Sequence, residues 1–403
     1  MVYFKGYSLK LFLHKSYMSN YPQFNVNNEH QLIRRQNTYV LDRKLVTIHT
    51  EDRDINKWAH PNHFEVELPE ALTNVQSMRL VEIEFPSNQY VFSNNQQNTK
   101  MEFYVIPTAP GNPPATYIAL SAHINKPFTI TIQAGFYTPE QMALEIQNLM
   151  NKAIEALPLV ATYDKFKVHY DTVGQKMFFG NTYDNFTFKF DEKIEYDVSC
   201  NAIIGSNQSP NVWNQYTKWG LPSYLGFNKK NTQLNPNYTT TSITEPYVFN
   251  YSPPPAWLTP DPSGNMAYYL SAPLAVCMSG ESVIYMEFDK YNSMDELKPY
   301  PEHTNDMYNN DYNGSVNAAF AKIPVTSSPH SQVFDSRNKF LQNVSQYHPP
   351  IDKIRKVKFK FRYHDGRLVD FQDCNFNFTV AFNQLRDEIA RDYEIRVPAA
   401  YQL

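Results

Sequence analysis

Alternation between apolar and polar side chains is the strongest pattern in the chain, and it is clearest near the C-terminus. From Lys356 to Tyr363, basic residues alternate with Val, Phe and Tyr, which places four apolar side chains on one face of an expected strand. Asp365-Gly366 follows, a pair that favours a tight turn because glycine tolerates positive φ. A second alternating run covers residues 375–382. The pattern predicts a hairpin and a return strand with one buried aromatic face and one polar face.

Shorter runs with the same period occur along most of the chain. They begin at Leu45 and are separated by segments that contain Pro and Asn. Short strands with such connections are typical of a β-sandwich or jelly roll. The expected strands lie at 45–49, 64–68, 81–85, 101–105, 128–132, 186–190, 282–288 and 318–325.

One segment has the period of a helix. Thr138 is a good N-cap, Pro139 suits the first helical position, and Gln141 completes the spacing of a capping box. An apolar stripe follows at helical spacing, formed by Met142, Ile146, Leu149, Met150 and Ala153. From this helix among strand-like runs we predict an α+β subdomain inserted into the sandwich, with the helix lying on a small antiparallel sheet. A second helix is expected at the C-terminus from the spacing of Leu385, Ile389 and Tyr393.

The expected fold class is therefore mainly β, with a jelly-roll or β-sandwich body, an inserted small α+β subdomain and extended arms. The first 28 residues contain three lysines and no acidic residue, and they show no sustained period, which favours an arm that becomes ordered against a partner. The expected parts are an N-terminal extended arm (1–44), the first half of the body (45–106), the inserted subdomain with a long Pro/Asn-rich loop (107–255), the second half of the body (256–385), and a C-terminal helix and tail (386–403).

Composition agrees with a sheet protein that makes contacts. The chain has 29 Tyr, 27 Phe and 28 Pro but only 12 Gly, and aromatic residues supply much of the buried area of protein interfaces. Its 36 basic and 40 acidic residues nearly balance, so the net charge does not indicate specific binding to nucleic acid.

The three cysteines, Cys200, Cys277 and Cys374, are far apart and odd in number. They predict neither a disulfide framework nor a Cys-x-x-Cys metal site, and they favour a reducing compartment. The first 15 residues lack the apolar core of a signal peptide. No window approaches the roughly 20 apolar residues of a membrane-spanning helix.

Motifs that carry chemistry are weak. Neither a phosphate-binding glycine loop nor a Gly-x-Ser-x-Gly elbow can be written. His60, His63 and Glu65 are conceivable metal ligands, but Pro61 and the strand that follows are unlike a helical zinc motif. The oxygen-rich segment 306–313 misses the EF-hand spacing and is more typical of turns, although calcium stays open. We therefore predict no catalytic, cofactor-binding or metal-binding residue, no cofactor and no small-molecule substrate.

The basic positions of the alternating run form a stripe about 7 Å apart on one strand face. Such a stripe is a solvated strand edge, or it meets an acidic neighbour or phosphate. Together with three tryptophans it supplies the candidate contact residues: Lys356, Lys358, Lys360, Arg362, Trp213, Trp219 and Trp257. Aromatic residues of the loop 206–257 and of the segment 1–28 are further candidates.

Several segments carry a resemblance to a known family. The order HFEVELPEAL, SMRLVEIEFPSNQY, FTITIQAGFYTPEQMALEIQNLMN, LPSYLGF, NAAFAKIPV and KFKFRYHDGRLVDFQDCNFNFTVAF resembles minor capsid proteins of nucleocytoplasmic large DNA viruses, the icosahedral giant viruses related to chloroviruses and mimiviruses. The resemblance runs from about residue 45 to residue 385 and contains no catalytic signature.

The resemblance implies jelly-roll modules that join major capsid protein capsomers to each other and to the inner viral membrane. We therefore expect a structural virion protein on the inner side of the shell, assembled in the host cytoplasm, with the major capsid protein and other minor capsid proteins as partners. A jelly-roll protein for carbohydrate binding or host attachment is the alternative. A secreted enzyme acting on glycans is a third reading, and it requires a buried pair of carboxylates in a cleft.

Overall fold

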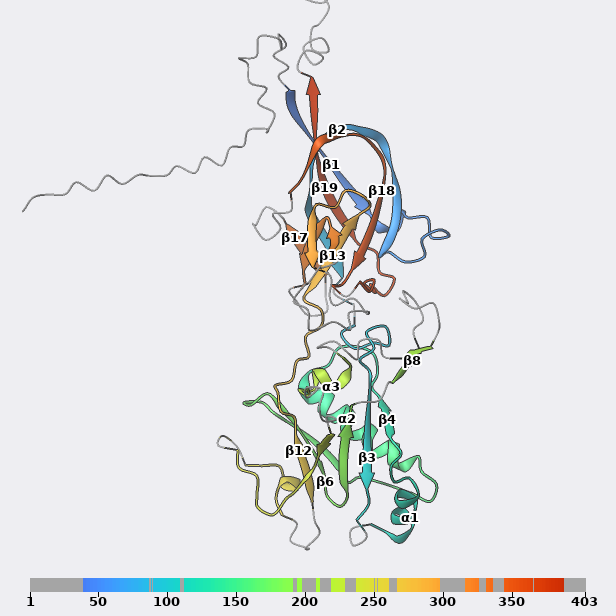
Figure 1. Ribbon diagram of the computed structural model, residues 1–403, viewed down its shortest axis with the longest axis vertical. Coiled ribbons are helices and arrows are strands. Elements are labelled where there is room, and N and C mark those ends of the chain that lie inside the picture. Colours follow the sequence, from blue (N-terminus) through green and yellow to red (C-terminus); the bar gives the residue numbers. More distant parts are fainter. Residues whose placement is uncertain are drawn as a thin grey trace, which may run out of the picture.

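The computed structural model describes residues 39–86, 88, 90–108, 112–190, 194–197, 208–210, 219–228, 237–249, 251, 253–260, 267–297, 316–325, 331–335, 344–364 and 366–387. These residues form two lobes that follow one another along the long axis of the molecule (Figure 1). The upper lobe contains both ends of the described chain, and the lower lobe is built from the middle of the sequence.

The upper lobe is one antiparallel sheet of seven strands. Its order is β1-β19-β2-β18-β13-β16, and β17 also pairs with β2. The strands are β1 (Tyr39–His49), β2 (His63–Pro86), β13 (Val283–Phe288), β16 (Ala321–Pro324), β17 (Ser331–Asp335), β18 (Val344–Arg362) and β19 (Asn377–Asp387). A one-turn 3-10 helix, Thr50–Asp52, follows β1.

The two longest strands make the sheet curl over its own core. β2 has 24 residues and joins two runs, 64–68 and 81–85, that we expected as separate strands. Its pairing with β18 shifts register between Gln346 and Ile351 and again between Ile354 and Lys356. Bulges of this kind bend a strand and increase its twist, and Figure 1 shows both strands curving around the lobe. The expected fold class, mainly β with a sandwich body of the jelly-roll type, is confirmed.

The aromatic face of the alternating run is the core, as predicted. Phe359 and Phe361 are fully buried, and so is Phe378 from the second run. The ring centroids of Phe288 and Phe359 lie 4.7 Å apart, and those of Phe359 and Phe378 lie 4.8 Å apart. Each such ring contributes about 1.5–3 kcal/mol through burial, so this cluster holds the strands together.

The predicted hairpin is shorter than the pattern suggested. The turn forms, since Tyr363 N donates to Arg367 O at 2.8 Å, and Gly366 has φ 91°. Only one bridge follows it, between Arg362 and Leu368. The second alternating run is β19, and it pairs with β1 and β2, so β2 separates it from β18.

The lower lobe contains two four-stranded antiparallel sheets with the orders β10-β7-β3-β4 and β11-β12-β6-β5. Their strands are β3 (Lys100–Ile106), β4 (Phe128–Thr131), β5 (Phe166–Asp171), β6 (Lys176–Asn181), β7 (Asn185–Lys189), β10 (Asn237–Thr239), β11 (Thr241–Ser242) and β12 (Tyr268–Ser271). The helices are α1 (Pro114–Ala122), α2 (Pro139–Glu155), α3 (Leu221–Tyr224) and a 3-10 turn, Ala256–Leu258.

Helix α2 has the predicted start and the predicted apolar face. Gln141 N donates to Thr138 Oγ1 at 3.2 Å, and Thr138 N donates to Gln141 Oε1 at 3.0 Å, which completes the capping box. Met142, Ile146 and Met150 are fully buried. The helix lies against β4 and β5. These strands belong to two different sheets, so the helix packs on strands as expected, but not on one small sheet.

Two short ribbons complete the described structure. β8 (Glu195–Asp197) pairs with β9 (Gln208–Pro210), and β14 (Met294–Leu297) pairs with β15 (Val316–Ala319). The expected strand 318–325 is divided at Phe320, which is buried between β15 and β16.

The lobes do not follow the expected part boundaries. β3 was expected in the first half of the body and β12 in the second half, but both belong to the lower lobe. The sheet of the upper lobe already includes residues 39–44, which we had placed in the arm, because β1 pairs with β19 from Tyr39 onward. Arg386 and Asp387 end β19 instead of starting a helix. The rest of the expected C-terminal helix, and residues 1–38 of the arm, lie outside the described residues.

Candidate interaction surfaces

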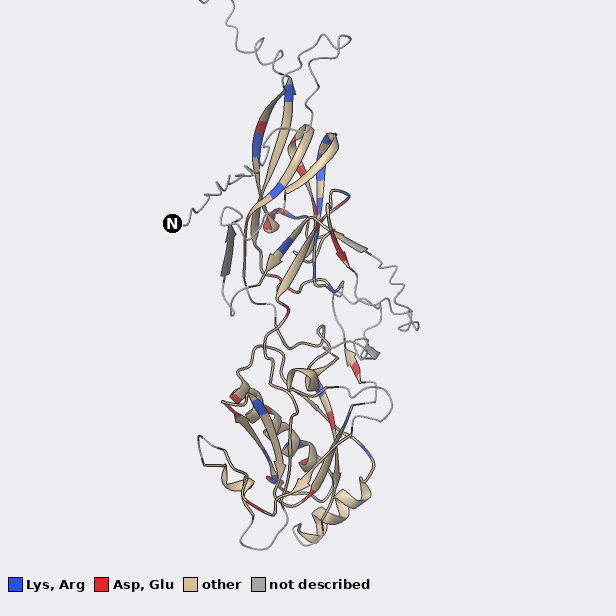
Figure 2. Ribbon diagram, turned by 60° about the vertical axis from the view of Figure 1, so that its left-hand side comes forward, with Lys and Arg blue, Asp and Glu red and all other residues tan. Residues whose placement is uncertain are grey.

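The basic stripe lies on β18, and acidic residues of the same chain pair with part of it. Figure 2 shows basic and acidic residues interspersed on the strands of the upper lobe. Lys356 Nζ is 3.7 Å from Glu65 Oε1 on β2, and Lys360 Nζ is 3.4 Å from Glu287 Oε2 on β13. Lys358 Nζ lies 5.1 Å from the centroid of the Trp58 ring. The sequence pattern left open whether the stripe meets acidic residues. These acidic residues lie on the adjacent strands of the same chain, and the three lysines remain partly exposed.

The positive charge of the stripe is felt by a histidine on β2. His63 faces Lys360 in the sheet register. Burial lowers the pKa of His63, and the charges of Lys358 and Lys360 lower this pKa further. The ring therefore stays neutral to a lower pH than an exposed histidine.

The conceivable metal ligands are not brought together. The His63 ring contacts Trp58, with ring centroids 4.8 Å apart, whereas His60 Nδ1 lies 2.9 Å from Asp373 Oδ1. Across the described ranges, no group of three or more His, Cys, Asp or Glu side chains could hold a metal ion. The segment 306–313 lies outside those ranges.

Arg362 differs from the rest of the stripe because it is buried, with 1% of its side chain exposed. Its Nε donates to Glu287, and its Nη1 donates to Glu296 Oε2 at 2.6 Å and to Tyr363 O at 3.1 Å. The guanidinium carbon lies 5.1 Å from the centroid of the Tyr285 ring. Arg362 is therefore an internal link between β13, β14 and β18. We expected it to contact a partner, but it is buried within the chain.

The two carboxylates around Arg362 bind further groups. Glu296 accepts a hydrogen bond from His364 through Oε1, and its side chain is 6% exposed. Burial, followed by the negative charge of Glu296, raises the pKa of Tyr285 to about 12. Sequence reasoning missed Glu287 and Glu296, because they are more than 60 positions from Arg362 and only the sheet brings them to it.

A second group of polar contacts links the lobes. Arg367 in the turn after β18 donates to Gln96 and, at 3.4 Å, to Asn95 O. Asn95 Nδ2 donates to Asp370 Oδ2 at 3.3 Å. The turn of the upper lobe is thus tied to the segment that enters the lower lobe.

The tryptophans are distributed differently from our expectation. Trp219 is 6% exposed, and its ring centroid is 5.2 Å from that of Phe190, so it belongs to the core of the lower lobe. Trp257 is half-buried and packs over Gly180 on β6. Trp213 lies outside the described residues.

The loop that we expected to make contacts does expose apolar side chains. Val248 is 76% exposed and Tyr251 is 46% exposed. Beside them, residues 241–248 and Tyr269 line a pocket of about 280 Å³. Tyr247, one of the lining residues, packs edge-on against Phe178.

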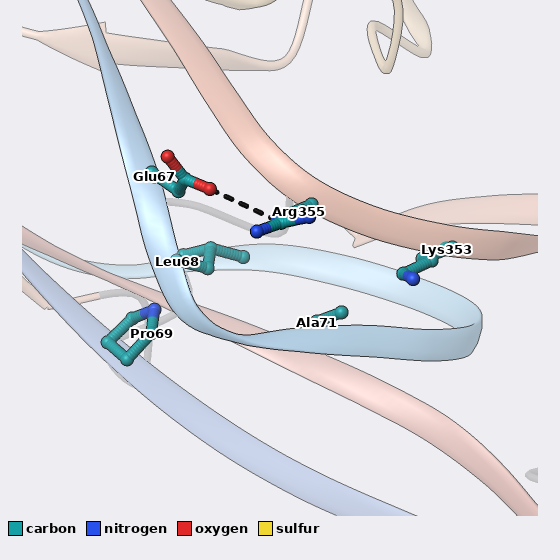
Figure 3. Close-up of a pocket in the computed structure, with 6 residues that line it drawn as sticks. All are labelled: Glu67, Leu68, Pro69, Ala71, Lys353 and Arg355. Carbon is teal, nitrogen blue, oxygen red and sulfur yellow. Dashed lines mark hydrogen bonds and ion pairs between the residues drawn. The ribbon is translucent and has the colours of Figure 1, made fainter.

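Another pocket lies where β2 bulges away from β18. Its volume is about 460 Å³, and Figure 3 shows its lining residues spread along the bend. Glu67 Oε1 accepts from Arg355 Nε at 3.1 Å across it. The lining consists of Glu67, Leu68, Pro69, Ala71, Lys353 and Arg355. With Arg355 and Glu67 more than half exposed, this is an open, charged notch in the surface.

The first and the last described strands, β1 and β19, meet at their outer ends. Tyr39, the first residue of β1, is opposite Asp387, the last residue of β19. The start of β1 and the end of β19 lie at the end of the upper lobe that is remote from the lower lobe (Figure 1). Near this end, Leu41 is 49% exposed and Leu45 is 59% exposed.

Two further findings concern the membrane and the thiols. Within the described ranges, no helix has the length and apolar character needed to cross a lipid bilayer. Cys277 is an exposed free thiol, and Cys374 is a half-buried one.

Neither a protein-family model nor a curated protein sequence matches this chain. Among solved structures, the mavirus penton protein aligns with 87% of this chain and 100% of its own, at 7% sequence identity and a TM-score of 0.40. A chain of the Sputnik virophage structure aligns with 87% of this chain and 99% of its own, at 12% identity and a TM-score of 0.36. Scores this low do not establish a common fold.

Proposed function

We propose that this chain is a structural virion protein, a minor capsid component that joins major capsid protein capsomers and stabilises an icosahedral shell. The proposal starts from the resemblance in the order of segments between residues 45 and 385. Its proposed partners are the major capsid protein and other minor capsid proteins, with the inner viral membrane as a further neighbour. Its proposed place is the inner side of the shell, after assembly in the host cytoplasm.

The observation that carries the proposal is the pairing of β1 with β19, which sets the first and the last described residues, Tyr39 and Asp387, opposite each other. A segment of 38 residues spans at most about 130 Å when extended. Residues 1–38 contain three lysines, two arginines and one glutamate. A basic segment of this length, which precedes β1 in the chain, is suited to reach neighbouring subunits and bind their acidic surfaces.

The proposed action is surface burial without chemistry. Permanent interfaces of this kind bury about 2,000 Å² or more. The exposed side chains of the loop 237–251, the partly exposed lysines of β18 and the segment 1–38 are the proposed contact regions.

The test uses purified virus particles and a virus that encodes the chain without residues 1–38. We expect mass spectrometry to find the intact chain in particles, and labelling of intact and opened particles to place it inside the shell. The deletion should reduce its incorporation and the yield of stable particles, while circular dichroism of the purified variant stays that of the intact protein.

Absence of the chain from purified particles would refute the proposal. Normal incorporation of the shortened chain would refute the role of the segment 1–38. Labelling of the outer surface, together with binding to a glycan array, would instead favour the carbohydrate-binding or host-attachment alternative.

A further inference from the structure

Strand β1 leaves one edge of the upper sheet open. Among the described strands it pairs only with β19, over all 11 of its residues. In an antiparallel ladder, alternate residues of an edge strand direct their N–H and C=O groups away from the neighbouring strand. A long edge of this kind is a template for another strand, and proteins that stay monomeric normally block it.

The outer face of β1 is apolar at two positions that water reaches. Leu41 and Leu45 are about half exposed on the same face, two residues to either side of Arg43. The Arg43 side chain turns toward β19, because its Nε donates to Asn383 Oδ1 at 3.1 Å. Leu41, Arg43 and Leu45 therefore share one face of β1, on which the Arg43 side chain leans over β19 and the two leucines stay exposed beside the open edge.

The sequence of this strand is complementary to itself in the antiparallel direction. Residues 40–46 read Val-Leu-Asp-Arg-Lys-Leu-Val, which is symmetric about Arg43 apart from the exchange of Asp for Lys. If two copies of β1 paired antiparallel with Arg43 opposite Arg43, Leu41 would face Leu45 of the partner and Asp42 would face Lys44 of the partner. Each of these pairs would occur twice. Apolar pairs and opposite charges directly across two strands both stabilise a sheet.

We propose that a second copy of this chain binds here, so that two β1 strands pair across a twofold axis at Arg43 and the upper sheets join into one. A twofold interface uses the same surface patch on both copies, and a self-complementary strand meets this requirement. The proposal is independent of the virion role.

The contacts that β1 makes within one copy are compatible with this pairing. Lys44 Nζ is 2.6 Å from Glu70 Oε2, and Arg386 Nε is 2.9 Å from Asp42 Oδ2. All four side chains are at least 40% exposed, and exposed ion pairs of this kind contribute little to stability. A carboxylate accepts hydrogen bonds from more than one cation, so Asp42 can bind the partner's Lys44 without releasing Arg386.

A disulfide at the axis tests the register. In the full chain with Cys200, Cys277 and Cys374 changed to Ser, Arg43→Cys places two thiols on directly opposite residues, whose Cα atoms are about 4.5–5.5 Å apart in an antiparallel pair. This separation allows a disulfide. The matched control is Thr47→Cys on the same face, because the two Thr47 positions would be about 26 Å apart. We expect rapid oxidation to a covalent dimer at position 43 and none at position 47.

A charge exchange tests the pairing without a covalent bond. Asp42→Lys or Lys44→Asp alone would create two like-charged pairs and should raise the dimer dissociation constant in sedimentation velocity about tenfold. The double variant Asp42→Lys/Lys44→Asp should restore dimerisation. Restoration cannot come from contacts within one copy, since the exchange sets like charges beside both Glu70 and Arg386.

Three results would overturn the proposal. They are a monomeric mass for the wild-type chain up to high micromolar concentration, equal cross-linking at positions 43 and 47, and a double variant no better than the single ones. A fourth result, a dimer that forms without cross-linking at position 43, would exclude pairing of β1 in this register.

Discussion

Replacing Arg362 by methionine removes the cation that pairs with both Glu287 and Glu296. Glu287 keeps Lys360 as a neighbour, since the Lys360 Nζ to Glu287 Oε2 distance is 3.4 Å. Glu296 is 6% exposed, and among the described residues it keeps His364 and Tyr285 as partners. The variant therefore leaves one buried carboxylate without a charged partner.

The expected loss of stability follows from this one unpaired carboxylate. Removal of one partner from a buried ion pair costs about 3–5 kcal/mol, because the other charge stays in a medium of low polarity. Since one of the two carboxylates keeps a lysine, we expect the lower end, about 3 kcal/mol. The double variant Arg362→Met/Glu296→Gln removes the unpaired charge as well. The double variant should be more stable than the sum of the two single changes predicts, by a coupling energy of about 1–2 kcal/mol.

The assay is native-state hydrogen exchange, because a protein of two lobes need not unfold in one step. Amides of β13 and β18 should lose protection by the stated free energy, while amides of α2 in the lower lobe should not change. Lys356→Met is the matched control on the same strand. Its pair with Glu65 is exposed, so it should cost less than about 1 kcal/mol. Equal small effects of Arg362→Met and Lys356→Met would refute the view that Arg362 is an internal link.

Three further predictions concern the lower lobe. Thr138→Ala should destabilise α2 by about 1 kcal/mol through loss of the cap to Gln141, and Thr138→Ser should not, as measured by hydrogen exchange of the helix amides. Gly180→Ala should destabilise the lobe by about 1–3 kcal/mol in urea unfolding, because the added Cβ would overlap the Trp257 ring, and Trp257→Ala should relieve most of this cost. Burial raises the pKa of Asp184 above its usual value near 3.8, so the folded state binds a proton more readily than the unfolded state. Stability should therefore fall as pH rises from about 3.8 through the folded-state pKa and then level off. Asp184→Asn should abolish this slope, and an unchanged slope would contradict it.

What the sequence determined by itself are the local periods. The two-residue alternation identified the strands and their buried face, because in a strand the direction of a side chain depends only on its position. The capping residues and the apolar stripe of α2 identified its start and its packed face for the same reason. The turn after Tyr363 was readable from Gly366.

Only the tertiary structure decided which strands meet. No short turn joins β19 to β1 or β2, so nothing local sets their register, and the packing of the whole sheet brings them together. Strand pairing in the folded chain also placed β3 and β12 in the lower lobe. It also divided the basic stripe of β18: Lys356 ends near Glu65 at the surface, whereas Arg362, only six residues further, is buried between Glu287 and Glu296. Alternation gives these two positions the same face, but what covers that face comes from strands far away in the chain.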